Sequence, residues 1–163
     1  MKQLLQQYAA YNVWANNRIM ETANQLSEQQ VNKEMVSSFA SVYKTVLHLM
    51  KVEDVWWQRL QLNAHTNIAD KIFDGDFNEL SVKLLQLSQQ WYNWVEEANE
   101  TEISNVFAYQ NSVLQNFKQP VYEMLLHLFN HQTLHRGQLI TMFRQLGVDK
   151  ISPTDFIVFT RKE

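Results

Sequence analysis

Apolar side chains recur along most of this chain at the i, i+3, i+4 and i+7 spacing that is typical of one face of an α-helix. The pattern predicts four long amphipathic helices. The first helix runs from about Lys2 to Leu26, and the second begins within residues 37–41 and ends near Leu62. The third runs from about Asp76 to Ala98, and the fourth from about Pro120 to Gly147. Four helices of this length predict an all-α four-helix bundle that forms a single domain over residues 1–163.

Residues with known capping preferences mark several helix ends. Asp76 is followed three residues later by Glu79, which is the capping-box pattern, and Ser27 in "SEQQ" predicts a short helical turn in the same way. Pro120 suits the first turn of the fourth helix, and Gly147 can adopt the left-handed conformation that ends it.

The connections between the helices differ in character. Residues 63–75 have no helical period and contain the turn pair Asp74-Gly75. Extended, these roughly 13 residues reach about 40 Å, the length of a whole helix. The second and third helices are therefore expected to run parallel, joined by a long crossover. Residues 101–118 also lack helical order, and "VFAYQN" and "LQNFKQ" predict a small β-hairpin there.

Composition and charge exclude several kinds of partner. The 14 basic and 17 acidic residues are mixed along the chain and the net charge is −3, so no nucleic-acid partner is expected. The absence of cysteine excludes disulfides, thiolate metal sites and a cysteine nucleophile. No apolar run approaches the ~18 residues of a membrane span, and "MKQLLQQYAAYNVW" lacks the apolar core of a signal peptide. We therefore expect a cytoplasmic protein with no membrane partner.

Histidines are concentrated on one face of the fourth predicted helix. His127, His131 and His135 follow one another at intervals of four residues, in a stripe with Met124 and Met142. Burying an imidazole without a partner costs on the order of 1–3 kcal/mol. A hydrogen bond can supply that partner. A metal ion can also supply it, because the adjacent turns that carry His131 and His135 converge on one point.

A metal site on this face needs a third ligand from another helix. His48 is the candidate, because it lies towards one edge of the apolar face of the second helix, whereas His65 lies in the following loop and is expected to be exposed. His127 is expected to face the same pocket without binding the metal, because three ligands stacked over two turns of one helix do not easily converge.

Four segments of the chain carry a resemblance to a known family. They are "YNVWANNRI" at 11–19, "SFASVYKTVLHLMKVEDVWWQRL" at 38–60, "HLFNHQTLHRGQLITMFRQLG" at 127–147 and "SPTDFIVF" at 152–159. Together they resemble the DinB-like (DinB/YfiT-type) family of metalloenzymes. The resemblance implies a four-helix bundle with a crossover, frequent dimers, and one divalent metal ion, zinc or nickel, held by His48, His131 and His135. Imidazole ligands alone would also suit cobalt or copper.

A site with three histidine ligands leaves one coordination position for water or substrate. It is therefore expected to serve metal-dependent hydrolysis of a small molecule that the sequence does not identify. The resemblance adds transfer of a low-molecular-weight thiol as an alternative, and a non-catalytic, stress-related metal-binding protein is a third interpretation. The sequence identifies no catalytic residue.

Other polar residues have two interpretations each. Asn12 and Asn16 fall inside the apolar stripe of the first helix, where they either line a polar substrate pocket or hydrogen-bond between helices. His127 and Gln138 share the histidine stripe and are expected to line the pocket or to support the metal ligands.

Two charged residues are expected to point away from the site. Glu53 lies about 140° around its helix from His48 and is expected to be solvated. Arg136 lies about 100° from His135, and a salt bridge or a helix-end contact is expected for it.

The first helix carries a second patch, away from its apolar stripe. It consists of Leu4, Tyr11, Trp14 and Arg18. The tail, the hairpin or the third helix can cover this patch within one chain, and a second copy of the chain can cover it in a dimer. The dimers that the resemblance implies favour a homodimer.

Overall fold

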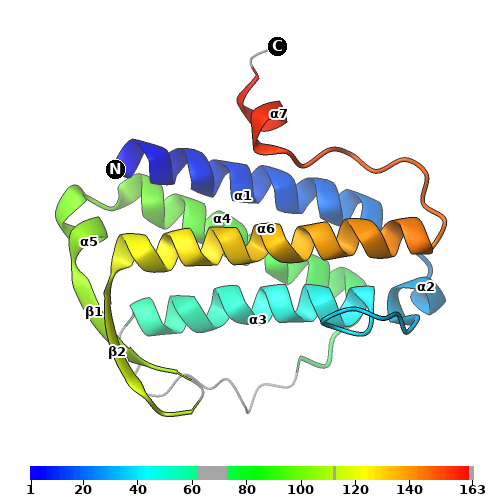
Figure 1. Cartoon of the computed structure of the whole chain (residues 1–163), viewed down its shortest axis with the longest axis horizontal. Helices are drawn as coiled ribbons and strands as arrows, with labels where there is room; N and C mark the ends of the chain where they lie inside the picture. The colour runs from blue at the N-terminus through cyan, green and yellow to red at the C-terminus, as the bar shows by residue number, and fades with distance from the viewer. Residues whose placement is uncertain (62–72, 112, 162–163) are drawn as a thin grey trace.

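The structure is a computed structural model that describes residues 1–61, 73–111 and 113–161. Four long helices form the predicted bundle (Figure 1): α1 (Lys2–Ala23), α3 (Val42–Leu60), α4 (Phe77–Glu97) and α6 (Val121–Gln145). Three short helices and two strands accompany them: α2 (Glu28–Asn32), α5 (Glu100–Ser104), α7 (Phe156–Thr160), β1 (Val106–Gln110) and β2 (Asn116–Pro120). The predicted all-α class is confirmed.

Helices α3 and α4 run in the same direction (Figure 1). Near their beginnings, the Tyr43 hydroxyl donates a 3.0 Å hydrogen bond to the carbonyl of Gly75, which just precedes α4. Near their ends, the rings of Trp57 and Trp91 meet with centroids 5.1 Å apart. The predicted crossover topology is therefore confirmed. Most of the predicted loop, including His65, lies outside the described residues.

Most helix ends follow the sequence signals. Ser27 and Asp76 each cap a helix in a complete capping box, as predicted. Gly147 follows α6 with φ of 84°, the left-handed conformation expected of it. Pro120 ends β2 and precedes the first turn of α6 instead of lying within it.

One short helix contradicts the sequence analysis. Residues 101–118 were predicted to lack helix, but α5 covers Glu100–Ser104. Asn99 accepts hydrogen bonds from the main-chain N–H groups of Thr101 and Glu102, and the Glu102 carboxylate closes a capping box. The Asn99–Glu102 spacing was the signal for this helix. The hairpin prediction is confirmed, since β1 and β2 pair antiparallel with Tyr109 opposite Phe117.

The bundle interior is divided into two apolar clusters. One cluster contains Leu49, Leu84, Leu139 and Phe143, and the other contains Leu5, Trp91, Leu125 and Phe129. In each long helix, buried polar side chains separate the residues of one cluster from those of the other. These side chains are Asn12, Asn16, Glu53, Ser88, Gln132 and Arg136. We call this set the polar layer.

The tail covers much of the second patch of α1. Tyr11 is 5 % exposed, and its hydroxyl donates a 2.7 Å hydrogen bond to the carbonyl of Thr154. The rings of Tyr11 and Trp14 both contact Phe159 of α7, with centroids 5.8 and 5.5 Å apart. The tail of the same chain thus covers these aromatic rings, which is one of the alternatives considered. The homodimer stays a prediction. No helix in the described parts of the chain is long and apolar enough to cross a membrane.

Candidate metal centre

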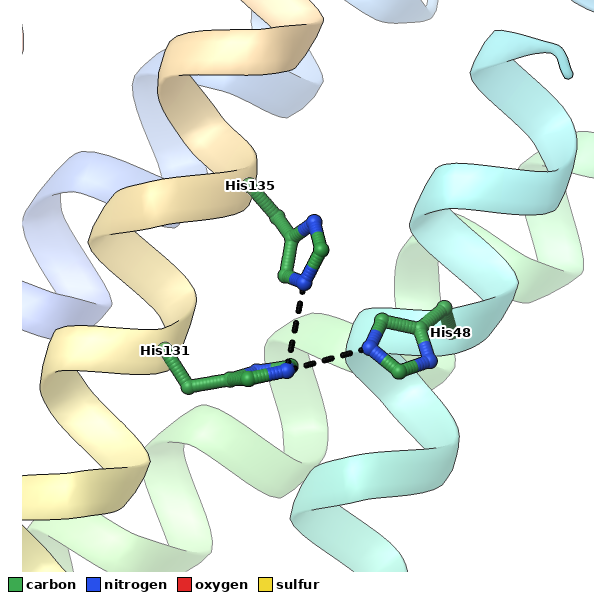
Figure 2. Close-up of side chains that lie close together, drawn as sticks. All are labelled: His48, His131 and His135. Carbon is green, nitrogen blue, oxygen red and sulfur yellow. Dashed lines mark hydrogen bonds between the residues drawn. The ribbon is translucent and has the colours of Figure 1, made fainter. Parts of the chain in front are cut away.

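Three histidine side chains from two helices meet at one point. His48 comes from α3, and His131 and His135 come from successive turns of α6 (Figure 2). The Nε2 atom of His131 lies 3.1 Å from Nε2 of His48 and 3.1 Å from Nε2 of His135. The structure thus brings together the three residues that the sequence analysis selected as metal ligands.

This arrangement fits a metal ion. Zinc–nitrogen bonds of about 2.0–2.1 Å at tetrahedral angles place ligand nitrogens roughly 3.3 Å apart, close to the 3.1 Å distances between these Nε2 atoms. Without an ion, Nε2 of His131 has to share its single proton or its single lone pair between both neighbouring nitrogens. The three histidines could therefore hold a metal ion.

The far side of the His135 ring is fixed by a polar contact. Its Nδ1 atom lies 2.8 Å from Oε1 of Gln138, and the Gln138 amide donates a 2.9 Å hydrogen bond to the Ser38 hydroxyl. An Nδ1–H donated to Gln138 leaves the Nε2 lone pair of His135 facing the other two histidines. Gln138 thus contacts one of the three clustered rings, and its role in supporting a metal ligand or lining a pocket stays a prediction.

The segment before α3 covers another side of the site. Phe39 stacks on the His48 ring, with centroids 4.1 Å apart and an interplanar angle of 25°. The same phenyl ring lies 5.5 Å from the His135 ring, centroid to centroid. Phe39 therefore restricts the orientation of His48 and shields the site from one direction.

Electrostatics keep two of the rings neutral. Burial, followed by the nearby His135 ring, lowers the pKa of both His48 and His131 to about 4. At neutral pH both rings are therefore unprotonated on one nitrogen, which is the form that binds a metal ion.

His127 lies one turn before the cluster and does not join it. Its side chain is exposed, and its ring centroid lies 5.8 Å from that of His131 and 5.6 Å from that of Trp56. This position agrees with a residue that faces the site without binding the ion, and its role towards a substrate stays a prediction.

Asn12 and Asn16 are fully enclosed in the polar layer. Each is 1 % exposed, and their carbonyl oxygens accept hydrogen bonds of 2.7 and 2.8 Å from the Arg136 guanidinium. The Asn16 amide donates a 2.9 Å hydrogen bond to Ser88 of α4. Asn12 and Asn16 thus make hydrogen bonds between helices, which is one of the two roles considered for them. A role in lining a substrate pocket stays a prediction.

Glu53 and Arg136 are both buried, which contradicts the solvated position expected for Glu53 and the salt bridge or helix-end contact expected for Arg136. Glu53 is 0 % exposed and Arg136 is 1 % exposed. The Glu53 carboxylate accepts hydrogen bonds from Asn12 at 3.1 Å and from Ser88 at 3.0 Å. Burial raises the pKa of Glu53 to about 8, although both hydrogen bonds and the Arg136 charge act to lower it. This carboxylate is bound within the polar layer and makes no hydrogen bond to the three histidines.

Gln132 joins the polar layer to α3 beside the histidines, and no sequence expectation included it. It is 0 % exposed, and its amide donates a 3.2 Å hydrogen bond to the main-chain carbonyl of Leu49. The sequence signal was its place one residue after His131, on the side of α6 that faces α3.

Comparison with known proteins places the chain in a family. The family model described as "DinB family" matches residues 1–162. This chain belongs to the DinB family. The curated protein "Protein DinB" of Bacillus subtilis (strain 168) is 27% identical over 154 residues, which cover 90% of this chain and 87% of that protein.

Two solved DinB-like structures share the fold. A DinB-like protein from Bacillus subtilis superposes with a TM-score of 0.70 at 15% identity, covering 91% of this chain and 98% of that one. A DinB-like protein from Bacillus cereus ATCC 10987 gives a TM-score of 0.61 at 15% identity, covering 85% and 91%. The DinB family match includes all three clustered histidines, and the names of these relatives state no substrate.

Proposed function

We propose that this DinB-family chain is a metal-dependent hydrolase that binds one divalent ion, zinc or nickel, through Nε2 of His48, His131 and His135. The observation that carries the proposal is the convergence of these three nitrogens within 4.8 Å of one another. Both metals suit imidazole ligands. Three protein ligands leave a further coordination position, which favours a catalytic role over storage or sensing of the ion.

A divalent ion in such a site lowers the pKa of a water molecule or polarises a carbonyl group of the substrate. The protein's own residues have separate tasks. Phe39 and Gln138 orient the ligand rings. His127 is the exposed imidazole next to the cluster, and partial burial and the Arg59 charge lower its pKa. It is therefore a neutral base at pH 7, in a position to accept a proton.

A second candidate is transfer of a low-molecular-weight thiol. It is favoured by the chemistry around the histidines, since in the described residues no carboxylate joins the cluster. A thiol that coordinates a divalent ion loses its proton without a carboxylate base. A non-catalytic, stress-related role would need the remaining coordination position to be closed.

Metal content tests the proposal directly. The chain, purified without a chelating tag, is expected to contain about one equivalent of zinc or nickel by elemental analysis, in line with one three-histidine site. The His131→Ala variant should contain far less, and His127→Ala should match the wild type. Hydrolysis of activated esters, measured with and without an added thiol, then separates hydrolase from transferase. Wild-type protein that binds no divalent ion would refute the proposal.

A further inference from the structure

An arginine is held between two aromatic rings near the histidine stripe. The guanidinium carbon of Arg59 lies 4.5 Å from the ring centroid of Trp56 and 5.1 Å from that of Tyr109. Arg59 and Trp56 belong to the last turns of α3, whereas Tyr109 comes from β1. The hairpin thus supplies one wall of a small site whose other wall is α3.

The walls of this site are themselves fixed. The Trp56 and Tyr109 rings meet edge to face with centroids 5.0 Å apart. The Tyr109 hydroxyl donates a 2.5 Å hydrogen bond to Gln119 on the neighbouring strand. Because both aromatic rings have other partners, the guanidinium keeps its orientation before any ligand arrives, which lowers the entropy cost of binding.

Within residues 1–61, 73–111 and 113–161, no carboxylate forms an ion pair with Arg59. The ion pair in these residues joins Lys44 and Glu34. The Nε atom of Arg59 is buried without a hydrogen-bond partner in the same residues. A buried donor left unpaired costs about 1–3 kcal/mol. The Nη groups of the same guanidinium are absent from the buried, unpaired atoms, and their planar fork matches an anionic ligand such as a carboxylate.

A row of contacting rings leads from Arg59 to the candidate metal centre. The Trp56 ring contacts the His127 ring, which in turn lies beside His131, with centroids 5.6 and 5.8 Å apart. His127 and His131 are one helical turn apart, about 6 Å along the axis of α6. A small molecule with one end at the three histidines can therefore place its other end at Arg59.

We propose that Arg59, with Trp56 and Tyr109, binds a carboxylate of the substrate, so that the substrate is a small organic acid. Its carboxylate lies one to two helical turns, about 5–11 Å, from the group that reacts. The site thereby selects acids over neutral molecules of the same shape. This inference rests on the proposed function, because it assigns the reacting end to the three histidines.

Paired probes test the charge preference. Hydroxamic acids bind divalent zinc, so a series is used in which the far end of the chain is either a carboxylate or the matching carboxamide. With zinc-loaded protein, calorimetry is expected to give at least about tenfold tighter binding of the carboxylate, as a charge-assisted hydrogen bond predicts. The preference should disappear in Arg59→Gln and be partly retained in Arg59→Lys. Equal binding of the two probes to wild-type protein would overturn the inference.

A matched control exists on α1. Arg18 also lies over a tryptophan, 4.4 Å from the Trp14 ring centroid, but it contacts the tail instead of the histidine stripe. Arg18→Gln should keep the carboxylate preference, and loss of the preference in this variant as well would contradict the assignment to Arg59.

Two further measurements separate this inference from the proposed function. Acetohydroxamate, which lacks the distal group, reports the metal centre alone, and its failure to bind would count against the proposed function. In metal-free protein, hexanoate should shift the Nε–H signal of Arg59 in nitrogen–proton spectra, whereas hexanamide should not. An unchanged signal would refute the carboxylate site whatever the metal result.

Discussion

Gln132 donates a hydrogen bond to the carbonyl of Leu49, and each of these residues directly follows a histidine of the candidate metal centre. The 3.2 Å bond joins α3 to α6 at the level where His48 must meet His131. Because the residues are sequence neighbours of the ligands, the bond fixes the axial position of one ligand-bearing helix relative to the other.

Replacing Gln132 should therefore weaken metal binding more than it weakens folding. Gln132→Leu keeps the side-chain size and removes the bond, which costs about 1 kcal/mol of stability. Zinc affinity should fall by about tenfold, since ligand geometry depends on supporting contacts. Competition with a chromogenic chelator measures the affinity. The exposed Gln145→Leu on the same helix is the control, and equal zinc affinity in both variants would contradict this role.

The ligand assignment predicts different results for neighbouring histidines. Alanine at His48, His131 or His135 removes one of three converging nitrogens and should abolish stoichiometric metal binding. His127→Ala should retain the metal, because the His127 ring only stands beside the cluster. It should instead lower any catalytic rate, and elemental analysis beside a rate measurement tests both statements. Metal loss in His127→Ala equal to that in His131→Ala would show that the ligands are misassigned.

The Gln138 contact predicts a graded effect. Gln138→Leu removes the acceptor at Nδ1 of His135 and the bond to Ser38. Metal affinity should fall by about 10–100-fold, as is typical when a partner of a ligating histidine is lost. Gln138→Glu supplies a stronger acceptor and should retain affinity close to that of the wild type. A Gln138→Leu variant that binds zinc as tightly as the wild type would exclude an orienting role.

Helical periodicity located the histidine stripe but underestimated how much of each helix is buried. With one core face expected for each helix, Glu53, about 140° from His48, was expected in solvent. In the bundle, α3 packs against two other long helices: His48 faces α6, whereas Glu53 faces Ser88 and Trp91 of α4. The same reasoning failed for Arg136, which faces Asn12 and Asn16 of α1.

Contacts between segments that are distant in the sequence lie beyond what helical periodicity can predict. Tyr11 and Trp14 stood out as apolar side chains in need of cover, but periodicity alone cannot tell a tail from a second copy of the chain. The deciding contacts join residues more than 140 positions apart, such as the hydrogen bond from Tyr11 to Thr154. By contrast, the capping boxes of α2 and α4 depend on residues three positions apart, and they were predicted correctly.

Removing the tail should expose the aromatic patch of α1. A chain that ends at Ser152 lacks Thr154 and Phe159, which contact Tyr11 and Trp14. The shortened chain should self-associate at lower concentration than the full chain, because an uncovered Tyr and Trp favour burial. Light scattering measures both masses. Full-length protein at twice the chain mass of 19.4 kDa would support the homodimer through another surface, and identical behaviour of both chains would refute this use of the tail.

Glu53 predicts a pH dependence of stability. Burial raises its pKa from the usual 4.5 to about 8, so between these values the folded chain keeps a proton that the unfolded chain releases. The contribution of Glu53 is therefore largest below pH 4.5 and is lost as pH rises to about 8. The total effect is on the order of a few kcal/mol. Glu53→Gln keeps a neutral side chain at every pH and should lack this loss.

Denaturant unfolding of metal-free protein at pH 5, 6.5 and 8 tests the Glu53 effect. His48 and His131 act in the opposite direction, because their lowered pKa values destabilise the fold as pH falls from 6.5 towards 4. The difference between wild type and Glu53→Gln cancels their contribution and isolates Glu53. Between pH 5 and pH 8, the free energy of unfolding of Glu53→Gln should rise relative to that of the wild type. The exposed Glu21→Gln should follow the wild type at every pH. A difference that is constant with pH would mean that Glu53 is ionised throughout, as a partner of Arg136.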